Sequence, residues 1–304
     1  MINSVAMGNL GNQFFTYAYA RKIQHELQQD INIYKFEIER LHYKFDLDCF
    51  YLNEHVNIQE IPMKDEKIVK LLLFFNRITR YSTSLNYIYN RFIRNVFSHL
   101  GIQFWMKETY EHFKIDGSHD NTLVGYWQCP QYFDDIREIL IQEFQPIFPP
   151  MEKNFELYKI IENNESICVS VRRGDYTSNP KIRKKYMVTD ENFFVDGVKK
   201  IRSVHPRAPI ICFSDDIDWV RNNIDFNGDV YYEDGDDPIW EKMRMMTKCK
   251  HFVISNSTFS WWAQYLSENP QKIIYAPFKW YADGRKADIY QENWNLIKAN
   301  GVNT

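Results

Sequence analysis

The sequence predicts an α/β protein of two domains. In the second half of this 304-residue chain, short apolar runs alternate with helical stretches, which is the pattern of parallel strands joined by crossover helices. The first half opens in a similar way, since the apolar run Ile2 to Ala6 is followed by a glycine-containing turn and by apolar residues at helical spacing. Prolines within residues 146–150 interrupt the chain, so we expect domains at residues 1–150 and 151–304.

The rest of the first half gives a mixed pattern. Strand-like segments occur at residues 31–38 and 122–126, and a helical stretch that we interpret as an insertion runs from Glu66 to about His99. The segment from Lys64 to Lys107 contains eight Lys or Arg residues, only two acidic residues, and the apolar run Leu71 to Phe75. Helices with solvated basic faces give this pattern, and so does a surface that approaches a membrane. Both interpretations stay open.

Composition limits the classes of function. The net charge of −3, with 25% charged residues, gives no positive field that would draw the protein onto nucleic acid. The five cysteines are scattered and never spaced as Cys-x-x-Cys, which argues against a disulfide framework and a zinc site. The N-terminus lacks a signal-peptide pattern, and no apolar run is long enough to span a bilayer. We expect a cytoplasmic protein, with peripheral contact at the inner face of the membrane as one option.

Five short apolar runs in the second half predict the strands of its sheet. They are residues 167–171, 210–213, 230–232, 252–254 and 273–275. Ligands of parallel sheets bind outside the carboxyl ends of the strands, so the residues just after each run are the candidates for chemistry.

The first motif, Ser170 to Tyr176, follows the first of these runs. Arg172 and Arg173 predict an anion site, because a guanidinium binds phosphate oxygens through two parallel hydrogen bonds and keeps its charge. Gly174 is expected to let the backbone turn sharply. The alternative is a surface arginine pair bound to Asp175.

The second motif, Phe213 to Asp216, offers carboxylates and a hydroxyl at the end of the next strand. A carboxylate accepts from two adjacent N–H groups, such as those of guanine, so Asp215 or Asp216 is a candidate reader of that base. Ser214 and the aspartates are equally well explained as caps of the following helix.

The third motif, Ile254 to Trp262, is a strand end followed by a hydroxyl-rich turn and a helix-like stretch. Backbone N–H groups at a helix start hold anionic oxygens, aided by nearby hydroxyls and the helix dipole. The candidate hydroxyls are those of Ser257, Thr258 and Ser260. Trp261 and Trp262 are expected in the core.

The turn at Gly8 to Gln13 is a fourth candidate because it follows the opening strand. It lacks the lysine of a nucleotide-triphosphate loop and the third glycine of a dinucleotide fingerprint, so neither site is predicted. By itself this turn is a weak signal.

Acidic residues from Glu233 to Asp237 contain the Asp-x-Asp pattern with which many enzymes hold a divalent metal against a diphosphate. The arginine pair argues against that role, because fixed guanidinium groups neutralise an anion without a metal. We interpret Asp236 and Asp237 as the start of a helix that carries Met243 and Met246 into the core. No histidines occur at metal-ligand spacing, so no metal or cofactor is predicted.

Together the motifs resemble glycosyltransferase family 11, the bacterial α-1,2-fucosyltransferases. The family's opening Gly-Gly-Leu-Gly-Asn-Gln-Met-Phe-Gln-Tyr-Ala is similar to residues 8–18, and its His-x-Arg-Arg-Gly-Asp-Tyr to residues 170–176. Its Phe-Ser-Asp-Asp and Asn-Ser-Thr-Phe-Ser-Trp-Trp match residues 213–216 and 256–262. Two positions depart from the pattern: Ser170 stands in place of histidine, so it is assigned no acid–base role, and Asn9 replaces a common glycine.

The resemblance implies a GT-B-like fold of two Rossmann-like domains facing a cleft, with the acceptor side in the first domain and GDP-fucose in the second. It implies inverting, metal-independent transfer of fucose from GDP-β-L-fucose to the 2-hydroxyl of a terminal galactose in an O-antigen, capsule or oligosaccharide. Arg172 is the expected partner of the leaving diphosphate, and Asp175 would orient Arg172 or receive the acceptor proton. The expected donor-binding residues are Gly11, Asn12, Arg173, Ser214, Asp215, Asp216, Asn256, Ser257, Thr258, Phe259 and Ser260.

Two alternatives stay open. One is another fucosyltransferase linkage on the same fold. The other is a non-catalytic sugar-binding component of a polysaccharide assembly complex, for which Ser170 is the only indication. The sequence predicts neither the acceptor nor the oligomeric state.

Overall fold

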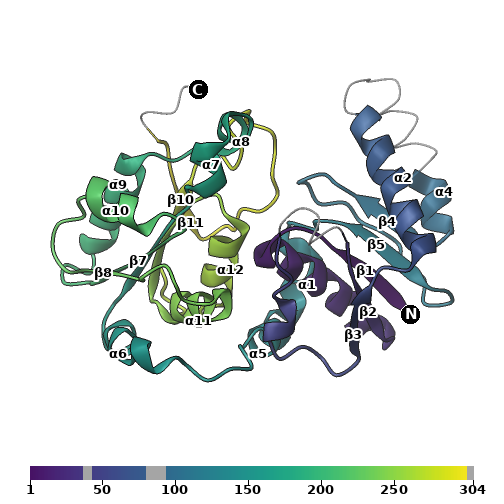
Figure 1. Ribbon diagram of the computed structural model, residues 1–304, viewed down its shortest axis with the longest axis horizontal. Helices are drawn as coiled ribbons and strands as arrows, with labels where there is room; N and C mark the ends of the chain where they lie inside the picture. The colour runs from purple at the N-terminus through teal and green to yellow at the C-terminus, as the bar shows by residue number, and fades with distance from the viewer. Residues whose placement is uncertain (37–42, 80–93, 300–304) are drawn as a thin grey trace. The chain divides into compact units, whose positions relative to one another are not determined.

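The chain forms two compact units, Met1–Phe144 and Gln145–Thr304, each built around one sheet (Figure 1). The structure is a computed structural model that describes residues 1–36, 43–79 and 94–299. All strand pairs in the described residues are parallel. Parallel strands need crossover connections, and helices supply most of them, as the alternating pattern predicts.

The first unit has a five-stranded sheet in the order β3-β2-β1-β5-β4. Its strands are β1 (Ile2–Ala6), β2 (Ile31–Lys35), β3 (Val56–Glu60), β4 (Ile102–Trp105) and β5 (Asn121–Gly125). Its helices are α1 (Leu10–Leu27), α2 (Met63–Thr79), α4 (Arg94–His99) and α5 (Arg137–Glu143), with short 3₁₀ helices at Leu47–Cys49, Pro130–Tyr132 and Asp134–Ile136. Every residue of β1 is buried, because this strand pairs with β2 and β5 and packs against α1.

The second unit has a six-stranded sheet in the order β11-β10-β9-β6-β7-β8. Its strands are β6 (Ile167–Val171), β7 (Ile210–Ser214), β8 (Val230–Tyr232), β9 (His251–Ile254), β10 (Ile274–Pro277) and β11 (Trp294–Ile297). Its helices are α6 (Phe155–Asn163), α7 (Gly174–Ser178), α8 (Pro180–Tyr186), α9 (Glu191–Arg202), α10 (Ile217–Asn223), α11 (Ile239–Lys248) and α12 (Thr258–Leu266), with a 3₁₀ helix at Glu152–Asn154. Starting at β8, this is the Rossmann strand order, whose direction of connection changes between β6 and β9.

The helices of the second unit bury apolar faces against its sheet. Phe193 and Val198 of α9 and Val220 of α10 lie in one buried cluster with residues of β6 and β7. Trp261 and Trp262 of α12 are fully buried, which confirms their predicted place in the core. Met243 and Met246 of α11 are also buried, as predicted.

The sequence predicted three strands with the bounds that the structure has: residues 2–6, 167–171 and 230–232. It missed β3, β4 and β11, which lie at sheet edges, and most residues of β3 and β11 are not buried. The helical stretch predicted from Glu66 to His99 corresponds to α2 and α4. Residues 80–93 of that stretch, and the end of the strand predicted at 31–38, lie outside the described residues.

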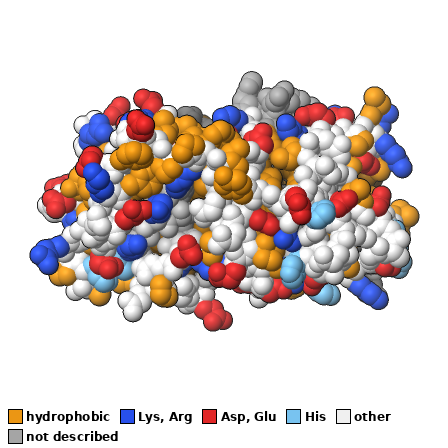
Figure 2. Space-filling model, turned by 90° about the horizontal axis from the view of Figure 1, so that it is seen from below, with side chains coloured by type: hydrophobic (Ala, Val, Ile, Leu, Met, Phe, Trp, Pro, Cys, Tyr) orange, Lys and Arg blue, Asp and Glu red, His pale blue; other side chains and the backbone are white. Residues whose placement is uncertain are grey.

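The described surface is mixed in charge. Figure 2 shows acidic and basic side chains interspersed with apolar ones on one face, in agreement with the small net charge of −3. None of the helices in the part of the chain that the structure describes has the length and apolar character needed to cross a bilayer.

Gly8 allows a test of the turn between β1 and α1. Its φ of 75° lies in the left-handed region, and a Cβ atom there would lie 2.6 Å from Asn12 Nδ2. We expect Gly8→Ala to lower the free energy of unfolding by about 1–2 kcal/mol in urea denaturation. Gly117→Ala is the control, because a Cβ atom there meets only ordinary contacts. Equal losses in the two variants would contradict this explanation.

Candidate functional site

The second unit brings two of the motifs together at the carboxyl ends of β6 and β9. These strands flank the point where the connections change direction, which is the usual ligand position in such sheets. Ser170 of β6 and Ser260 of α12 are buried, and their hydroxyl oxygens lie 2.6 Å apart. The Tyr176 hydroxyl donates to the Asn256 carbonyl oxygen at 3.2 Å. The first and third motifs are therefore in contact.

Two arginine–aspartate pairs join the first motif to the second. Arg172 Nη1 lies 2.7 Å from Asp215 Oδ2, and Arg173 Nε donates to Asp216 Oδ2 at 3.1 Å. The Arg173 backbone N–H donates to Asp215 Oδ1 at 2.8 Å. Asp215 therefore accepts at both oxygens and holds the segment after β6 to the segment after β7.

Gly174 lies very close to Asp215. Helix α7 begins at this glycine, and its φ is not in the left-handed region. A Cβ atom at Gly174 would lie 2.5 Å from Asp215 Oδ2. The chain passes from β6 to α7 within residues 172–173, and this turn does not require a left-handed φ at Gly174. The glycine instead provides the space for the Arg172–Asp215 pair.

The two arginines differ in their surroundings. The side chain of Arg173 is 15% exposed, and its guanidinium carbon lies 3.2 Å from the centroid of the Trp219 ring. The side chain of Arg172 is 31% exposed and lies 5.8 Å from the centroid of the Tyr176 ring. Stacking and pairing fix Arg173 in place, and the side chain of Arg172 is the more exposed of the two. Sequence reasoning missed Trp219, because it lies inside α10 rather than at a strand end.

The second motif leads directly into helix α10. Ser214 Oγ accepts from the Asp216 backbone N–H at 3.0 Å, just before α10 begins at Ile217. Asp216 is the N-cap residue of α10 and makes no side-chain cap hydrogen bond, so the predicted helix cap is not formed and Ser214 instead holds the turn that leads into α10. The side chain of Asp216 is 40% exposed and that of Asp215 is 27% exposed, so Asp216 is the more accessible carboxylate.

Some residues of the third motif are buried and hold its turn in place, and others are half-buried at the start of α12. Asn256 is buried, and its Nδ2 donates to the carbonyl oxygens of Tyr186 and Trp280, both at 2.8 Å. Ser260 is engaged with Ser170. The residues between them, 257–259, are half-buried and form the N-cap and first turn of α12. The N–H groups of a first helical turn have no acceptor within the helix, so this turn is suited to an anion.

The first unit has a corresponding strand end, where β1 lies beside β5. Asn12 Oδ1 accepts from Gln128 Nε2 at 2.9 Å, and Gly11 lies in the first turn of α1. Gln13 is buried and donates to the carbonyl oxygens of Gly8 and Lys44, both at 2.8 Å. Gln13 therefore supports the turn that carries Gly11 and Asn12, and the sequence did not predict the contact of Asn12 with Gln128.

The catalytic candidate Asp175 falls within α7, but its side chain lies outside the described part of the chain. The structure therefore does not test its role.

Comparison with known families covers almost the whole chain. Residues 1–298 match the model of glycosyl transferase family 11. The chain belongs to this family. This glycosyltransferase is 28% identical to the O-antigen biosynthesis glycosyltransferase WbnK of Escherichia coli, over 96% of its own length and 98% of the relative. It is 29% identical to an α-1,2-colitosyltransferase of Escherichia coli, over 96% of its own length and 97% of the relative.

The fold of the glycosyltransferase is similar to that of a solved fucosyltransferase. The crystal structure of NodZ α-1,6-fucosyltransferase co-crystallised with GDP matches with a TM-score of 0.51 and 13% identity, over 90% of this chain and 94% of NodZ. At this identity the likeness concerns the fold alone. It confirms the GT-B class of two Rossmann-like domains that the motifs imply.

Two groups of described residues in the glycosyltransferase gather metal-ligand types. In the first, Glu233, Asp234 and Asp237 lie together after β8. Lys242 Nζ lies 3.1 Å from Glu233 Oε2, and Lys153 Nζ lies 2.8 Å from Asp237 Oδ1. These two lysines offset most of the charge of the three carboxylates, which favours a structural role for the cluster.

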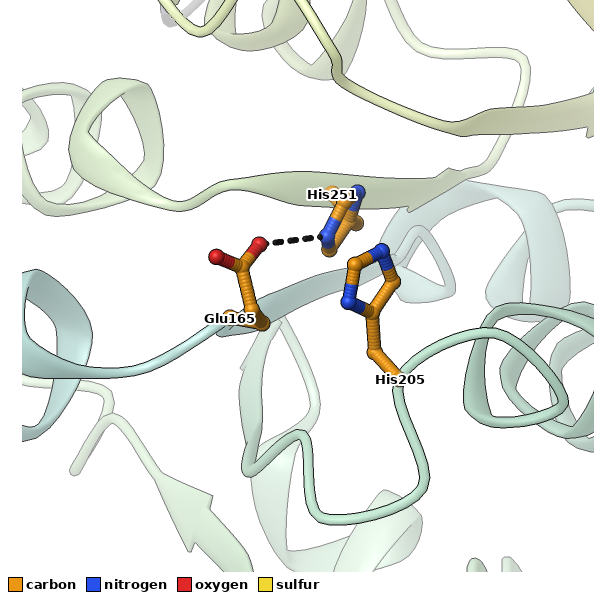
Figure 3. Close-up of side chains that lie close together, drawn as sticks. All are labelled: Glu165, His205 and His251. Atoms are coloured by element: carbon orange, nitrogen blue, oxygen red, sulfur yellow. Dashed lines mark hydrogen bonds and ion pairs between the residues drawn. The ribbon is translucent and has the colours of Figure 1, made fainter.

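The second group, Glu165, His205 and His251, lies at the amino ends of β6 and β9 (Figure 3). Arg172 follows the carboxyl end of β6. His251 Nε2 lies 3.0 Å from Glu165 Oε2, and the His205 ring stacks on the His251 ring with centroids 4.4 Å apart. Sequence spacing did not predict that these histidines meet.

The hydrogen bonds of His251 favour a structural role. The Ile273 backbone N–H donates to His251 Nδ1 at 3.1 Å, so Nε2 carries the proton that points to Glu165. A metal on Nε2 would require a proton on Nδ1, directly opposite the Ile273 N–H. Burial lowers the pKa of His251, although Glu165 acts in the other direction.

His251 predicts a loss of stability on acidification. Because its pKa is lowered in the folded protein, the unfolded chain binds the proton first as the pH falls below about 6.5. We expect the free energy of unfolding to be highest above this pH and to decrease as the pH falls toward the lowered pKa. Urea denaturation at a series of pH values measures this dependence.

Two variants isolate the contribution of His251. His251→Asn keeps an acceptor for the Ile273 N–H but does not titrate, so we expect a shallower decrease with falling pH. His112 is exposed, and His112→Asn is expected to follow the unaltered protein. The same pH slope in His251→Asn and in the unaltered protein would contradict the assignment.

Proposed function

We propose that this glycosyltransferase transfers L-fucose from GDP-β-L-fucose to the 2-hydroxyl of a terminal galactose in a glycan, with inversion at the anomeric carbon. Membership of family 11 and the α-1,2 linkage named for one relative support the linkage. The observation that carries the mechanism is the Arg172 guanidinium, held by Asp215 at the carboxyl end of β6.

Arg172 is our candidate for the residue that stabilises the leaving group. The acceptor hydroxyl attacks the anomeric carbon, the bond to the β-phosphate breaks, and GDP departs with the electron pair. A hydrogen-bond donor that is oriented before the reaction best stabilises the negative charge that develops on the leaving phosphate. A guanidinium carries five N–H donors in a planar fork that suits carboxylate and phosphate oxygens alike, so the Asp215 contact is compatible with this role.

We assign different roles to the two aspartates of the second motif. Asp215 uses both oxygens on the segment that contains Arg172, so we assign it the orientation of that arginine. Asp216 is more exposed, and we assign it the recognition of guanine, with Ser214 supporting its turn. Because Asp215 already orients Arg172, reception of the acceptor proton is the role that we propose for Asp175.

The remaining donor contacts are proposed at two helix starts. Ser257, Thr258 and Phe259 at the start of α12 are suited to bind the diphosphate, while Asn256 and Ser260 hold that turn in place. In the first unit, Gly11 and Asn12 remain candidates for contact with the donor or the acceptor. Ser170 is paired with Ser260, and a serine hydroxyl does not titrate near neutral pH, so it takes no part in proton transfer.

The relatives support the setting of the reaction and one second candidate. The name of the WbnK relative supports an acceptor in O-antigen assembly, and we place the reaction in the cytoplasm. Colitose is the second candidate for the transferred sugar, because an α-1,2-colitosyltransferase matches this chain over nearly its full length. A comparison of the two GDP-sugars as donors distinguishes these candidates.

Metal independence and the role of Arg172 are tested together. The protein is incubated with GDP-fucose, a panel of β-galactosides and EDTA, and products are examined by mass and linkage analysis. We expect α-1,2-linked product in EDTA, because guanidinium groups neutralise the leaving diphosphate. Arg172→Ala should lower turnover by about 10²–10³-fold. Arg172→Lys keeps the positive charge but loses the planar guanidinium, so its turnover should lie between those of Arg172→Ala and the unaltered protein.

The control for Arg172 is Arg221→Ala, since Arg221 is an exposed arginine of the same unit that pairs with Asp218. It should retain full turnover. A strict requirement for Mn²⁺, or full turnover by Arg172→Ala, would overturn the mechanism. Binding of GDP without any product would favour a non-catalytic role.

Asp215→Asn tests the orientation of Arg172. The change keeps the size of the side chain and removes its charge, so the guanidinium loses its fixed position. We expect kcat to fall about 10- to 100-fold, with a smaller change in the KM for GDP-fucose. Asp218→Asn, at an exposed position on α10, is the matched control. A raised KM with unchanged kcat would instead assign Asp215 to donor binding.

A further inference from the structure

Helix α2 of the first unit is apolar on two opposite faces. Its inner face covers the sheet, where Val69 and Leu72 are buried in a cluster with residues of β1, β2, β4 and β5 (Figure 1). Its outer face exposes apolar side chains as well, with Leu71 49% exposed and Phe74 58% exposed. A helix that only covers a sheet carries polar residues on its outer face, so the second apolar face needs its own explanation.

Basic residues border this outer face on both sides. Residues at intervals of three or four lie on one stripe of a helix. The outer stripe of α2 consists of Met63, Lys67, Leu71, Phe74 and Ile78, all exposed. Lys64 lies on one side of the stripe, and Lys70 and Arg77 lie on the other. Lys70 pairs with Glu66 within α2, but all three basic side chains are exposed.

We propose that the outer stripe of α2 docks onto a lipid bilayer that carries anionic headgroups. A helix lying in a membrane interface buries its apolar side chains and places Lys and Arg at the headgroups. The outer stripe and its basic border have this arrangement, and their charge is complementary to anionic lipid. Val96 and Leu100, exposed on and just after α4, add apolar surface to the same unit.

A bilayer fits the outer stripe better than a second copy of the chain. Two copies joined around a two-fold axis would bring the stripe's Lys67 and the bordering Lys70 and Arg77 close to the same residues of the other copy, and like charges oppose such pairing. An anionic bilayer has no such conflict. The whole chain has a net charge of −3, so its overall charge does not attract anionic lipid. The attraction comes from the basic residues that border the outer stripe.

Vesicle co-sedimentation of the full-length protein tests the inference. We expect binding to phosphatidylcholine vesicles that contain phosphatidylglycerol and little binding to phosphatidylcholine alone. Leu71→Ser/Phe74→Ser should weaken the partition coefficient about 30-fold or more through lost apolar burial. Lys67→Gln/Arg77→Gln, which leaves the apolar residues in place, should weaken it about 30-fold through lost charge.

The matched control is Phe155→Ser/Val204→Ser, which removes two exposed apolar side chains from the second unit. It should bind vesicles as the unaltered protein does. Transfer of the sugar to a soluble acceptor should be unchanged in every variant. Vesicle binding is measured separately from transfer, so failure of the proposed function would not change the vesicle result. The inference is overturned if the unaltered protein ignores anionic vesicles or both stripe variants keep full binding. It is also overturned if sedimentation velocity shows a dimer that Leu71→Ser/Phe74→Ser abolishes without any vesicle binding.

Discussion

The geometry of the site depends on the carboxylate of Asp215, which accepts from the Arg172 side chain and from the Arg173 backbone at once. Pairing of β6 with β7 brings the two segments to one edge of the sheet, but it does not fix the direction of a long arginine side chain. The ion pair is partly exposed, so its contribution to stability is small. Its effect is to orient the guanidinium, and Gly174 leaves the space in which this happens.

The sequence was sufficient to predict that the motifs of the second half meet. The carboxyl ends of parallel strands lie at one edge of a sheet, so the motifs that follow β6, β7 and β9 lie at that edge. This holds however the connecting helices pack. The individual pairings could not be predicted. From the sequence, Asp175, Asp215 and Asp216 are all plausible partners of Arg172, and the pair with Asp215 joins segments that are far apart in the chain.

Other features depend on contacts that local patterns do not contain. His205 and His251 are distant in sequence, and only the packing of a loop against the start of β9 brings their rings together. The edge strands β3 and β11 lack a continuous apolar signal because much of each is exposed. For α2 the sequence left two interpretations of a basic, apolar helix. Because Leu71 and Phe74 are exposed, the outer face of α2 is not simply a solvated basic face, which favours the interpretation of a surface that approaches a membrane.

Chemical rescue of Arg172→Ala by guanidinium ion, in the presence of EDTA, tests the central claim most directly. If an oriented guanidinium rather than a metal stabilises the negative charge of the departing GDP, added guanidinium ion should restore part of the turnover of Arg172→Ala. The restored turnover should saturate with the concentration of guanidinium ion. The rescue should require Asp215, and so should be absent from Arg172→Ala/Asp215→Asn. No rescue in the single variant, or full recovery with Mn²⁺ once EDTA is omitted, would contradict the account.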